Sequence, residues 1–363
     1  MLLWRSDSIA VWRNEEVRRR LSHYYKVMKG ERNAKYRVVK RFPVDFSDDM
    51  TVEELMSLHS EMRREFDEFY EEKMERDLTD NIPHGNFLEL KIRIVKLLVR
   101  ECKLCEWRCG ARRLEGERGV CGLDSKVRVS TAFLHMGEEA PLVPSGTIFF
   151  TGCSFKCVFC QNYDISTNPF NGIETDPQRL ASICRELSRE GARNINYVGG
   201  NPDQQLHVII PSLRYMDVNI PLLWNSNMYM TEEALELLLD LIDIWLPDFK
   251  YGNNECGLRL SKVKNYFEIV SRNHKRVCEV NDVIIRHLVL PNHIECCTKP
   301  VLLWIARHCN RALVNVMSQY RPEHLVYREP EKYSDIARRP NNREMEEAYK
   351  YADELGLCWK PVS

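Results

Sequence analysis

The sequence predicts an α/β protein whose core is a partial (β/α)6 barrel of parallel strands, with a helical N-terminal extension and a small cysteine-rich metal segment. From Thr147 onward, short apolar stretches alternate with amphipathic segments, which is typical of a parallel sheet with helical connections. Each apolar stretch is followed directly by glycine or polar residues. The carboxyl ends of parallel strands converge on one face of such folds, so these residues are expected to meet there.

Residues 1–100 predict a charged helical extension. A capping box at Thr51–Glu54 precedes a run of apolar residues at helical spacing, and Phe87–Glu101 predicts a second, more apolar helix. Between Arg13 and Arg41, eleven Lys and Arg residues stand against three Glu residues. This stretch is either a docking surface for a macromolecule or a solvated helix face, and the pattern favours the solvated face.

The barrel is expected within residues 140–325, after a cysteine-rich segment at 101–125 and before a helical tail at 326–363. Thr175-Asp176-Pro177 predicts the start of a helix, with a cap and a first-turn proline, and Thr231 predicts the start of another. Six strand–helix units are too few for a closed eight-stranded barrel, so the sheet is expected to be open. The expected strands are Thr147–Phe150, Asn194–Val198, Leu222–Asn225, Ile244–Asp248, Val283–Leu290 and Ala312–Met317.

Composition restricts the classes of function. The formal net charge of −1 gives no reason to expect nucleic acid or an anionic membrane as the partner. The apolar runs are too short to cross a membrane and the first twenty residues are too charged for a secretory signal, so a cytoplasmic protein is expected. Fourteen cysteines then point to metal binding or redox chemistry rather than to disulfides. Seven are scattered, and for most of them a small buried apolar role is expected: Cys184, Cys256, Cys278, Cys296, Cys297, Cys309 and Cys358.

Three cysteines follow the first expected strand at close spacing: Cys153, Cys157 and Cys160. Three thiolates can hold a 4Fe–4S cluster and leave one iron without a protein ligand, whereas such clusters normally take four cysteines. The amino and carboxylate groups of S-adenosylmethionine could fill that open position. A catalytic zinc site with a bound water and a set of metal-free buried thiols are the alternatives. The position of the motif at a strand end favours the cluster.

A second group of cysteines lies upstream, within a glycine-rich segment: Cys102, Cys105, Cys109 and Cys121. Four cysteines at these spacings can form a closed tetrahedral site, for which zinc is the simplest occupant. A second iron–sulfur cluster would also accept four cysteines. Four free thiols are the remaining interpretation, and the spacing favours a structural metal site.

The spacing of Cys153, Cys157 and Cys160 matches the signature of the radical S-adenosylmethionine (SAM) superfamily. The chain from about Glu101 to Pro322 resembles the pyruvate formate-lyase activating enzyme-like group of unassigned substrate, with further motifs in the same order. Asn201 stands where that family has an acidic residue after two glycines. The resemblance implies that SAM is bound by Gly199, Gly200, Asn201, Asn225, Ser226, Asn227, Asp248, Lys250, Arg286, Gln319 and Tyr320.

The resemblance implies an oxidoreductase in which the reduced cluster cleaves SAM to methionine and a 5′-deoxyadenosyl radical, which takes a hydrogen atom from the substrate. It places Asp248 and Lys250 near the reaction. Two residues apart at a strand end, these side chains point to the same side, although a surface ion pair is the alternative. The implied substrate is a protein or peptide, such as a glycyl-radical enzyme to be activated, and the implied electron donor is a ferredoxin or flavodoxin.

A competing hypothesis is a non-catalytic iron–sulfur or zinc protein that acts in electron transfer or assembly. The polar groups after the second to sixth expected strands argue against it, because a carrier needs no pocket for a cofactor.

Overall fold

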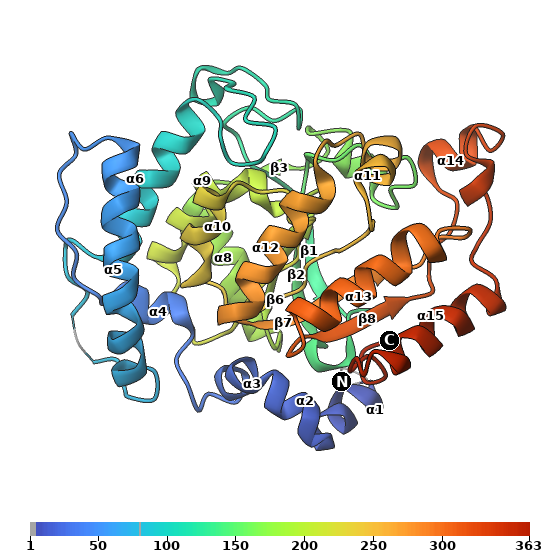
Figure 1. Ribbon diagram of the computed structural model, residues 1–363. Helices are drawn as coiled ribbons and strands as arrows, with labels where there is room; N and C mark the ends of the chain where they lie inside the picture. The colour runs from blue at the N-terminus through green and yellow to red at the C-terminus, as the bar shows by residue number, and fades with distance from the viewer. Residues whose placement is uncertain (1–4, 80) are drawn as a thin grey trace.

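The computed structural model describes residues 5–79 and 81–363, so residues 1–4 and 80 of the expected extension lie outside the described part. One sheet of eight strands runs through the molecule in the order β3-β1-β2-β4-β5-β6-β7-β8 (Figure 1). The strands are β1 (Arg128–His135), β2 (Ser145–Phe150), β3 (Ile173–Glu174), β4 (Ile195–Gly199), β5 (Leu222–Trp224), β6 (Ile244–Trp245), β7 (Asp282–Leu288) and β8 (Leu313–Met317).

The six strands β2 and β4–β8 are parallel and correspond to the six strands expected from the sequence. The sheet does not close, because β8 pairs only with β7 and the opposite edge is β3. The partial six-unit barrel is therefore confirmed. Side chains on its central strands, such as Trp224 and Trp245, are completely buried.

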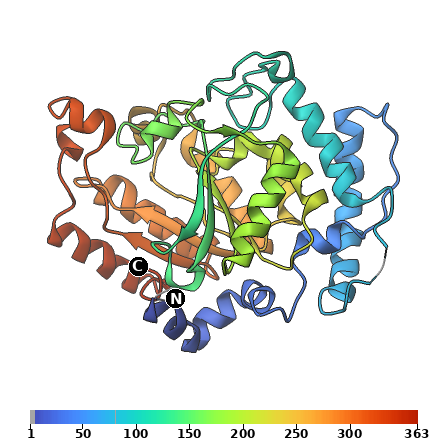
Figure 2. The ribbon, with the colours of Figure 1, turned by 180° about the vertical axis from the view of Figure 1, so that it is seen from behind.

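Strand β1 was not expected from the sequence. It runs antiparallel to β2, beside it at the back of the molecule (Figure 2), and the rings of Phe133 and Phe149 stack across the pair. Much of β1 is exposed or half-buried, since it lies outside the parallel strands. Its sequence consequently has neither the apolar run of a buried strand nor a clean alternation.

Helices connect the parallel strands and cover the outside of the barrel. The expected starts are confirmed: Asp176 caps α8 and Thr231 caps α10, each accepting a hydrogen bond from a backbone N–H in the first turn. The helices are α7 (Tyr163–Ser166), α8 (Pro177–Arg189), α9 (Leu206–Ser212), α10 (Glu232–Leu239), α11 (Asn254–Ser261), α12 (Tyr266–Val280), α13 (Lys299–His308), α14 (His324–Arg328) and α15 (Asn342–Glu354). No helix in the described ranges is long and apolar enough to cross a membrane.

The N-terminal extension divides into a helical pair at the side and a base under the barrel (Figure 1). Its helices are α1 (Ser6–Ala10), α2 (Glu15–Arg20), α3 (Ser22–Met28), α4 (Lys35–Val39), α5 (Val52–Lys73) and α6 (Phe87–Arg100). The expected capping box at Thr51 is present, and α5 buries its apolar stripe against α6. The run of apolar residues expected at helical spacing is thus covered within the chain.

The first helices close the amino ends of the strands. Trp12, Leu21 and Tyr24 form one buried cluster with strand residues that include Leu223 and Ile284. Several charges between residues 13 and 41 make contacts within the chain. Arg20 donates to the backbone of residue 312, and the side chains of residues 26 and 32 both pair with the carboxylate of residue 75.

Candidate active site

A cavity of about 250 Å³ lies at the carboxyl ends of the parallel strands. It brings together every residue that the sequence predicted for the cluster and for SAM, with the exception of Tyr320. The lining residues from that set are Cys153, Cys157, Cys160, Gly199, Gly200, Asn201, Asn225, Ser226, Asn227, Asp248, Lys250, Arg286 and Gln319. These residues come from segments spread over more than 160 residues of sequence. They line the same cavity because each segment lies at the carboxyl end of a parallel strand.

The three thiols each have a different polar neighbour. Asn227 Nδ2 lies 3.7 Å from Cys153 Sγ, Ser261 Oγ lies 3.0 Å from Cys157 Sγ, and the hydroxyl of residue 166 lies 3.3 Å from Cys160 Sγ. Burial raises the pKa of all three thiols, and that of Cys157 to about 11. Free thiols are therefore disfavoured as thiolates here, and a bound metal would supply the charge that makes them ionise.

Close backbone contacts explain two of the glycines beside the cluster loop. A Cβ atom on Gly200 would lie 2.1 Å from the carbonyl oxygen of Gly152, and Gly199 has a φ of +117°. Both positions require glycine, because the loops after β2 and β4 touch through their backbones. Cys153 and the Gly-Gly segment are thereby fixed next to each other.

Asn201 and the buried carboxyl group of Asp203 tie the loop after β4 to the loop after β5. Asn201 Oδ1 accepts from the backbone N–H of Asn227 at 3.1 Å. Asp203 accepts from Trp224 Nε1 at 3.0 Å and from the Ser226 hydroxyl at 2.7 Å. Burial raises the pKa of Asp203 to about 6. Sequence reasoning did not select Asp203, although an acid two residues after Asn201 was visible.

Asp248 and Lys250 form an ion pair on the cavity wall, as two strand-end residues on the same side can. Burial alone would lower the pKa of Lys250, but the carboxylate of Asp248 and the thiol of Cys157 raise it. The backbone N–H of Lys250 donates to the hydroxyl of Tyr266 at 2.7 Å. The site therefore presents one negative and one positive group side by side, both held in place.

Arg286 lines the cavity, but its guanidinium is already paired. It donates to Glu139 at 2.7 Å through two nitrogens and also contacts Glu138. These carboxylates accept from amide side chains on β8 and β4: Asn315 at 2.7 Å and Asn196 at 3.0 Å. The two neighbouring carboxylates raise the pKa of Arg286, although burial opposes this. Glu138 and Glu139 were not predicted, because they lie almost 150 residues away in sequence.

Tyr320 does not reach the cavity. Its hydroxyl donates to the carbonyl of Ile336 at 2.7 Å, and its ring lies edge-on to Phe159 with the centroids 5.5 Å apart. It therefore supports the cluster loop from behind, while its neighbour Gln319 lines the cavity.

The upstream cysteines come together less tightly than a metal site requires. A Cβ atom on Gly119 would lie 3.1 Å from Cys109 Sγ and 3.5 Å from Cys121 Sγ, so both sulfurs lie close to Gly119. In the described part of the chain, however, their donor atoms do not form a group within 4.8 Å of one another. The expected zinc at Cys102, Cys105, Cys109 and Cys121 therefore gains no support from the geometry.

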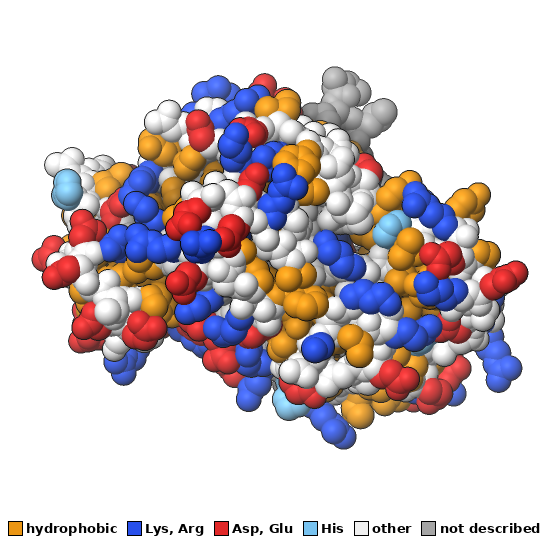
Figure 3. All heavy atoms as spheres, turned by 90° about the horizontal axis from the view of Figure 1, so that it is seen from above, with side chains coloured by type: hydrophobic (Ala, Val, Ile, Leu, Met, Phe, Trp, Pro, Cys, Tyr) orange, Lys and Arg blue, Asp and Glu red, His pale blue; other side chains and the backbone are white. Residues whose placement is uncertain are grey.

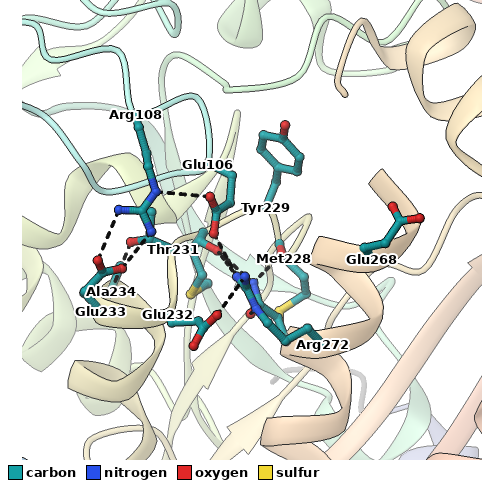
Figure 4. A network of polar contacts seen from close by, with 12 residues as sticks. Glu106, Arg108, Met228, Tyr229, Thr231, Glu232, Glu233, Ala234, Glu268 and Arg272 are labelled. Carbon is teal, nitrogen blue, oxygen red and sulfur yellow. Dashed lines mark hydrogen bonds and ion pairs between the residues drawn. The ribbon is translucent and has the colours of Figure 1, made fainter. Parts of the chain in front are cut away.

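A network of ion pairs fixes the cysteine-rich segment to the barrel (Figure 4). Arg108 pairs with Glu233 at 3.0 Å, while Arg272 bridges Glu106 at 2.9 Å and Glu232 at 3.0 Å. In addition, Trp107 Nε1 donates to the backbone of the cluster loop at residue 154, at 2.9 Å. The segment thus contacts both the loop after β5 and the loop that carries the three thiols.

The scattered cysteines differ from expectation. Cys278 and Cys309 form a disulfide. Three others, Cys256, Cys296 and Cys297, lie around His293. Their grouping was not predicted, because about 40 residues separate the two halves of the set and no compact motif contains them.

An open parallel barrel with three thiols facing a strand-end cavity defines a class of cluster-binding enzymes. The sequence model of the radical SAM superfamily matches residues 147–305. The chain is also 44% identical, over 347 residues, to the uncharacterized protein MJ0674 of Methanocaldococcus jannaschii, covering 93% of this chain and 98% of that one. The chain belongs to the radical SAM superfamily, and this membership implies an enzyme with a 4Fe–4S cluster and SAM as cofactors.

Two solved structures align with parts of this chain. SuiB of Streptococcus suis bound to S-adenosylmethionine aligns with a TM-score of 0.40 and 14% identity, over 56% of this chain and 44% of that chain. A domain of pyruvate-formate lyase-activating enzyme from Bacteroides vulgatus aligns with a TM-score of 0.32 and 13% identity, over 50% of this chain and 88% of that chain.

The donor set fits the cluster. The described residues that line the cavity include Cys153, Cys157 and Cys160 and no fourth cysteine. Three protein thiolates leave one coordination position for a small molecule that enters the same cavity.

Proposed function

We propose that the protein is a radical SAM oxidoreductase that cleaves SAM reductively and takes a hydrogen atom from a protein or peptide, as an activator of a glycyl-radical enzyme does. The observation that carries the proposal is that three thiols and a full set of amide, glycine and charged groups face one cavity. A carrier of electrons would need only the thiols.

In this proposal Cys153, Cys157 and Cys160 hold the cluster. When bound, the reduced cluster would supply one electron to break the C5′–S bond of SAM, which would release methionine and provide the 5′-deoxyadenosyl radical that abstracts hydrogen from the substrate. The protein contributes the dry surroundings: Cys153 and Phe159 are almost completely buried. It also contributes the neighbouring Asn227 amide, since hydrogen bonds to sulfur tune the potential of such clusters.

The cavity wall suits a zwitterion. Asp248 and Lys250 place a carboxylate and an ammonium side by side, complementary to the amino and carboxylate groups of SAM. The backbone at Gly199 and Gly200 is accessible because these residues carry no side chains. Asn201 offers an amide where relatives have an acid, so we assign the amino group of SAM to Asp248 rather than to Asn201.

A protein or peptide substrate is supported by an exposed aromatic and basic surface beside the cluster loop. The rings of Tyr163 and His324 stack with centroids 5.1 Å apart, and the guanidinium of Arg328 lies over the Tyr163 ring. Tyr327, on the same short helix, is 76% exposed. Tyr and Arg are enriched at protein interfaces. Seen from above, acidic and basic side chains are intermingled (Figure 3), unlike the basic field of a nucleic-acid-binding surface.

The electron donor in this proposal is a ferredoxin or flavodoxin. Gln161 and Asn162 follow the last cluster cysteine directly and are exposed. A small donor could therefore approach the cluster from this side of the loop.

The first test measures the cleavage of SAM. Anaerobically reconstituted protein is mixed with dithionite and SAM, and 5′-deoxyadenosine is quantified. We expect turnover in the wild type and in the control Cys358→Ala, and no product and a lower content of cluster iron in Cys157→Ala. Cluster-loaded wild type without product would reject the proposal, and turnover by Cys157→Ala would show that the ligands are different.

A second test addresses the substrate class. Deuterium-labelled cell extract is separated into a protein fraction and a small-molecule filtrate, and each is added to the assay. We expect the protein fraction to transfer deuterium into 5′-deoxyadenosine. Transfer from the filtrate alone would exclude a protein substrate while leaving the cleavage of SAM intact.

The upstream quartet enters the proposal as a second metal site, with zinc or an iron–sulfur cluster as the occupant. What supports it is the number and the spacing of the four thiols in the sequence. Metal analysis of a Cys102→Ser/Cys105→Ser variant tests it, and a metal content equal to that of the wild type would reject the site.

A further inference from the structure

A further group of side chains that could hold a metal ion lies outside the cavity, between α11 and the start of α13. It consists of Cys256, His293, Cys296 and Cys297, whose donor atoms all lie within 4.8 Å of one another. Cys256, His293 and Cys297 are buried, and Cys296 is exposed. Nothing in the radical SAM motif uses these residues.

The spacing of the donor atoms matches that around one tetrahedral ion. His293 Nδ1 lies 3.1 Å from Cys296 Sγ, 3.7 Å from Cys256 Sγ and 3.9 Å from Cys297 Sγ. The sulfurs of Cys296 and Cys297 are 3.8 Å apart. Metal–sulfur bonds of about 2.3 Å in a tetrahedron separate two sulfur ligands by about 3.8 Å. The four groups could thus bind one ion with little movement.

The histidine is already oriented as a ligand. Its Nδ1 faces the three thiols, and its Nε2 lies 3.0 Å from Asp335 Oδ2. Asp335 is itself held by an ion pair with Arg259. A carboxylate on the far nitrogen of a histidine is the usual support of a metal-bound imidazole, since it fixes the ring and the tautomer.

The backbone around the set is specialised. Residues Ile294–Thr298 form a π-helical turn, in which the N–H groups of Cys297 and Thr298 both donate to the carbonyl of His293. Such turns are rare and occur frequently at functional sites. Asn253 Nδ2 donates to the carbonyl of Cys296 at 2.8 Å, which joins the start of α11 to this turn. Both halves of the set are therefore positioned independently of a bound ion.

We propose that Cys256, His293, Cys296 and Cys297 bind a single thiolate-preferring divalent cation of the zinc type. All four positions are supplied by the protein, which is the pattern of a structural site rather than a catalytic one. The ion would fasten α11 to the chain segment before α13. The last residue of α11, Ser261, lies 3.0 Å from Cys157 Sγ, so the site would also steady one wall of the cluster loop.

The test compares metal contents of anaerobically purified protein. Cys296→Ser is the first variant, because the exposed Cys296 can change without disturbing the core. The matched control is Cys358→Ser, a partly buried cysteine outside every group. We expect Cys296→Ser to lose one equivalent of zinc relative to the control, with cluster iron and sulfide unchanged. The difference is independent of any metal at the upstream quartet, which both variants retain.

A second measurement separates the loss of a metal ligand from misfolding of the variant. Asp335→Asn keeps all four ligands and removes only the carboxylate, and we expect its affinity for cobalt(II) to fall roughly 10–100-fold. Cobalt(II) bound to wild type should give the absorbance of tetrahedral thiolate coordination. Equal zinc in Cys296→Ser and its control would overturn the proposal. So would a disulfide among these three cysteines in oxygen-free preparations, detected by mass spectrometry.

Discussion

The carboxyl group of Asp203 is completely buried between the loops that follow β4 and β5. It accepts from Trp224 and Ser226, and these hydrogen bonds only partly offset the loss of water. Its pKa in the folded protein is about 6, above that of an exposed carboxyl group. The folded state therefore binds this proton more tightly than the unfolded state, and the contribution of Asp203 to stability decreases as pH rises from about 4 through about 6.

We expect Asp203→Asn to remove this pH dependence. Between pH 4.5 and 7, the unfolding free energy of the wild type should fall by roughly 2 kcal/mol relative to the variant. Chemical denaturation of both proteins across this range measures the difference. A difference that stays constant with pH would show that the carboxyl group does not titrate there.

Lys250 is the charged residue of the cavity wall whose removal should be most informative. Lys250→Met keeps much of the side-chain volume and leaves the carboxylate of Asp248 without its cation. If the ammonium binds the carboxylate of SAM, losing that charge-assisted hydrogen bond should raise KM for SAM roughly 10–100-fold. The assay is 5′-deoxyadenosine formation at varied SAM, with iron content as the control. An unchanged KM would assign SAM binding to other groups.

Some site residues could be predicted and others could not, for a physical reason. Gly199, Asn227 and Lys250 lie at or shortly beyond the carboxyl ends of β4, β5 and β6, and parallel topology brings strand ends together whatever the distance in sequence. Asp203 and Glu139 act through contacts with particular side chains of other segments. No local pattern encodes such pairings, so they became visible only in three dimensions.

At the scale of elements, α5 and α6 are attached to the barrel through a buried ion pair. Lys91 is completely buried, and its Nζ lies 2.9 Å from Asp240 Oδ2 and 2.6 Å from His59 Nε2. Arg63 also pairs with Asp240, at 2.9 Å. Burial and the neighbouring Lys91 hold the pKa of His59 well below its usual value, so the neutral imidazole accepts a hydrogen bond from the Lys91 ammonium.

We expect Lys91→Met to lower the unfolding free energy by about 3 kcal/mol, because Asp240 keeps Arg63 but loses its buried partner. The exposed Lys96 on the same helix provides the control Lys96→Met, which should change stability by less than about 0.5 kcal/mol. Denaturant unfolding compares them. Equal stabilities would mean that apolar packing alone attaches these helices.

Buried strands could be predicted from the sequence, whereas a partly exposed strand could not. All six parallel strands were located from the sequence, since strands covered on both faces are apolar runs with clear ends. Strand β1 was missed because three of its eight residues are exposed and it lies next to the edge strand of the sheet. The helices with caps, such as α8 and α10, were located at their first residues.

For the whole molecule, the barrel depends on the chain segment that precedes it by more than 100 residues. An open barrel leaves the amino ends of its strands without cover, and α1–α3 supply that cover through one apolar cluster. The backbone N–H of Tyr24 also donates to Asp282 at the start of β7, at 2.8 Å. This role was not predicted, because residues 13–41 are rich in charged side chains and only a few apolar residues among them contact the strands.

Trp12 is the largest side chain of this cover, 9% exposed and packed against Tyr25 with ring centroids 4.8 Å apart. We expect Trp12→Ala to lower the unfolding free energy by about 3–5 kcal/mol, since it opens a cavity under the barrel. Trp359, half-buried against Tyr349, gives the control Trp359→Ala, for which a smaller loss is expected. Because Trp12 lies at the end of the strands opposite the cavity, cleavage of SAM per bound cluster should stay at the wild-type rate at low temperature. A stability loss no greater than that of the control would contradict the assignment of residues 6–28 as the base of the barrel.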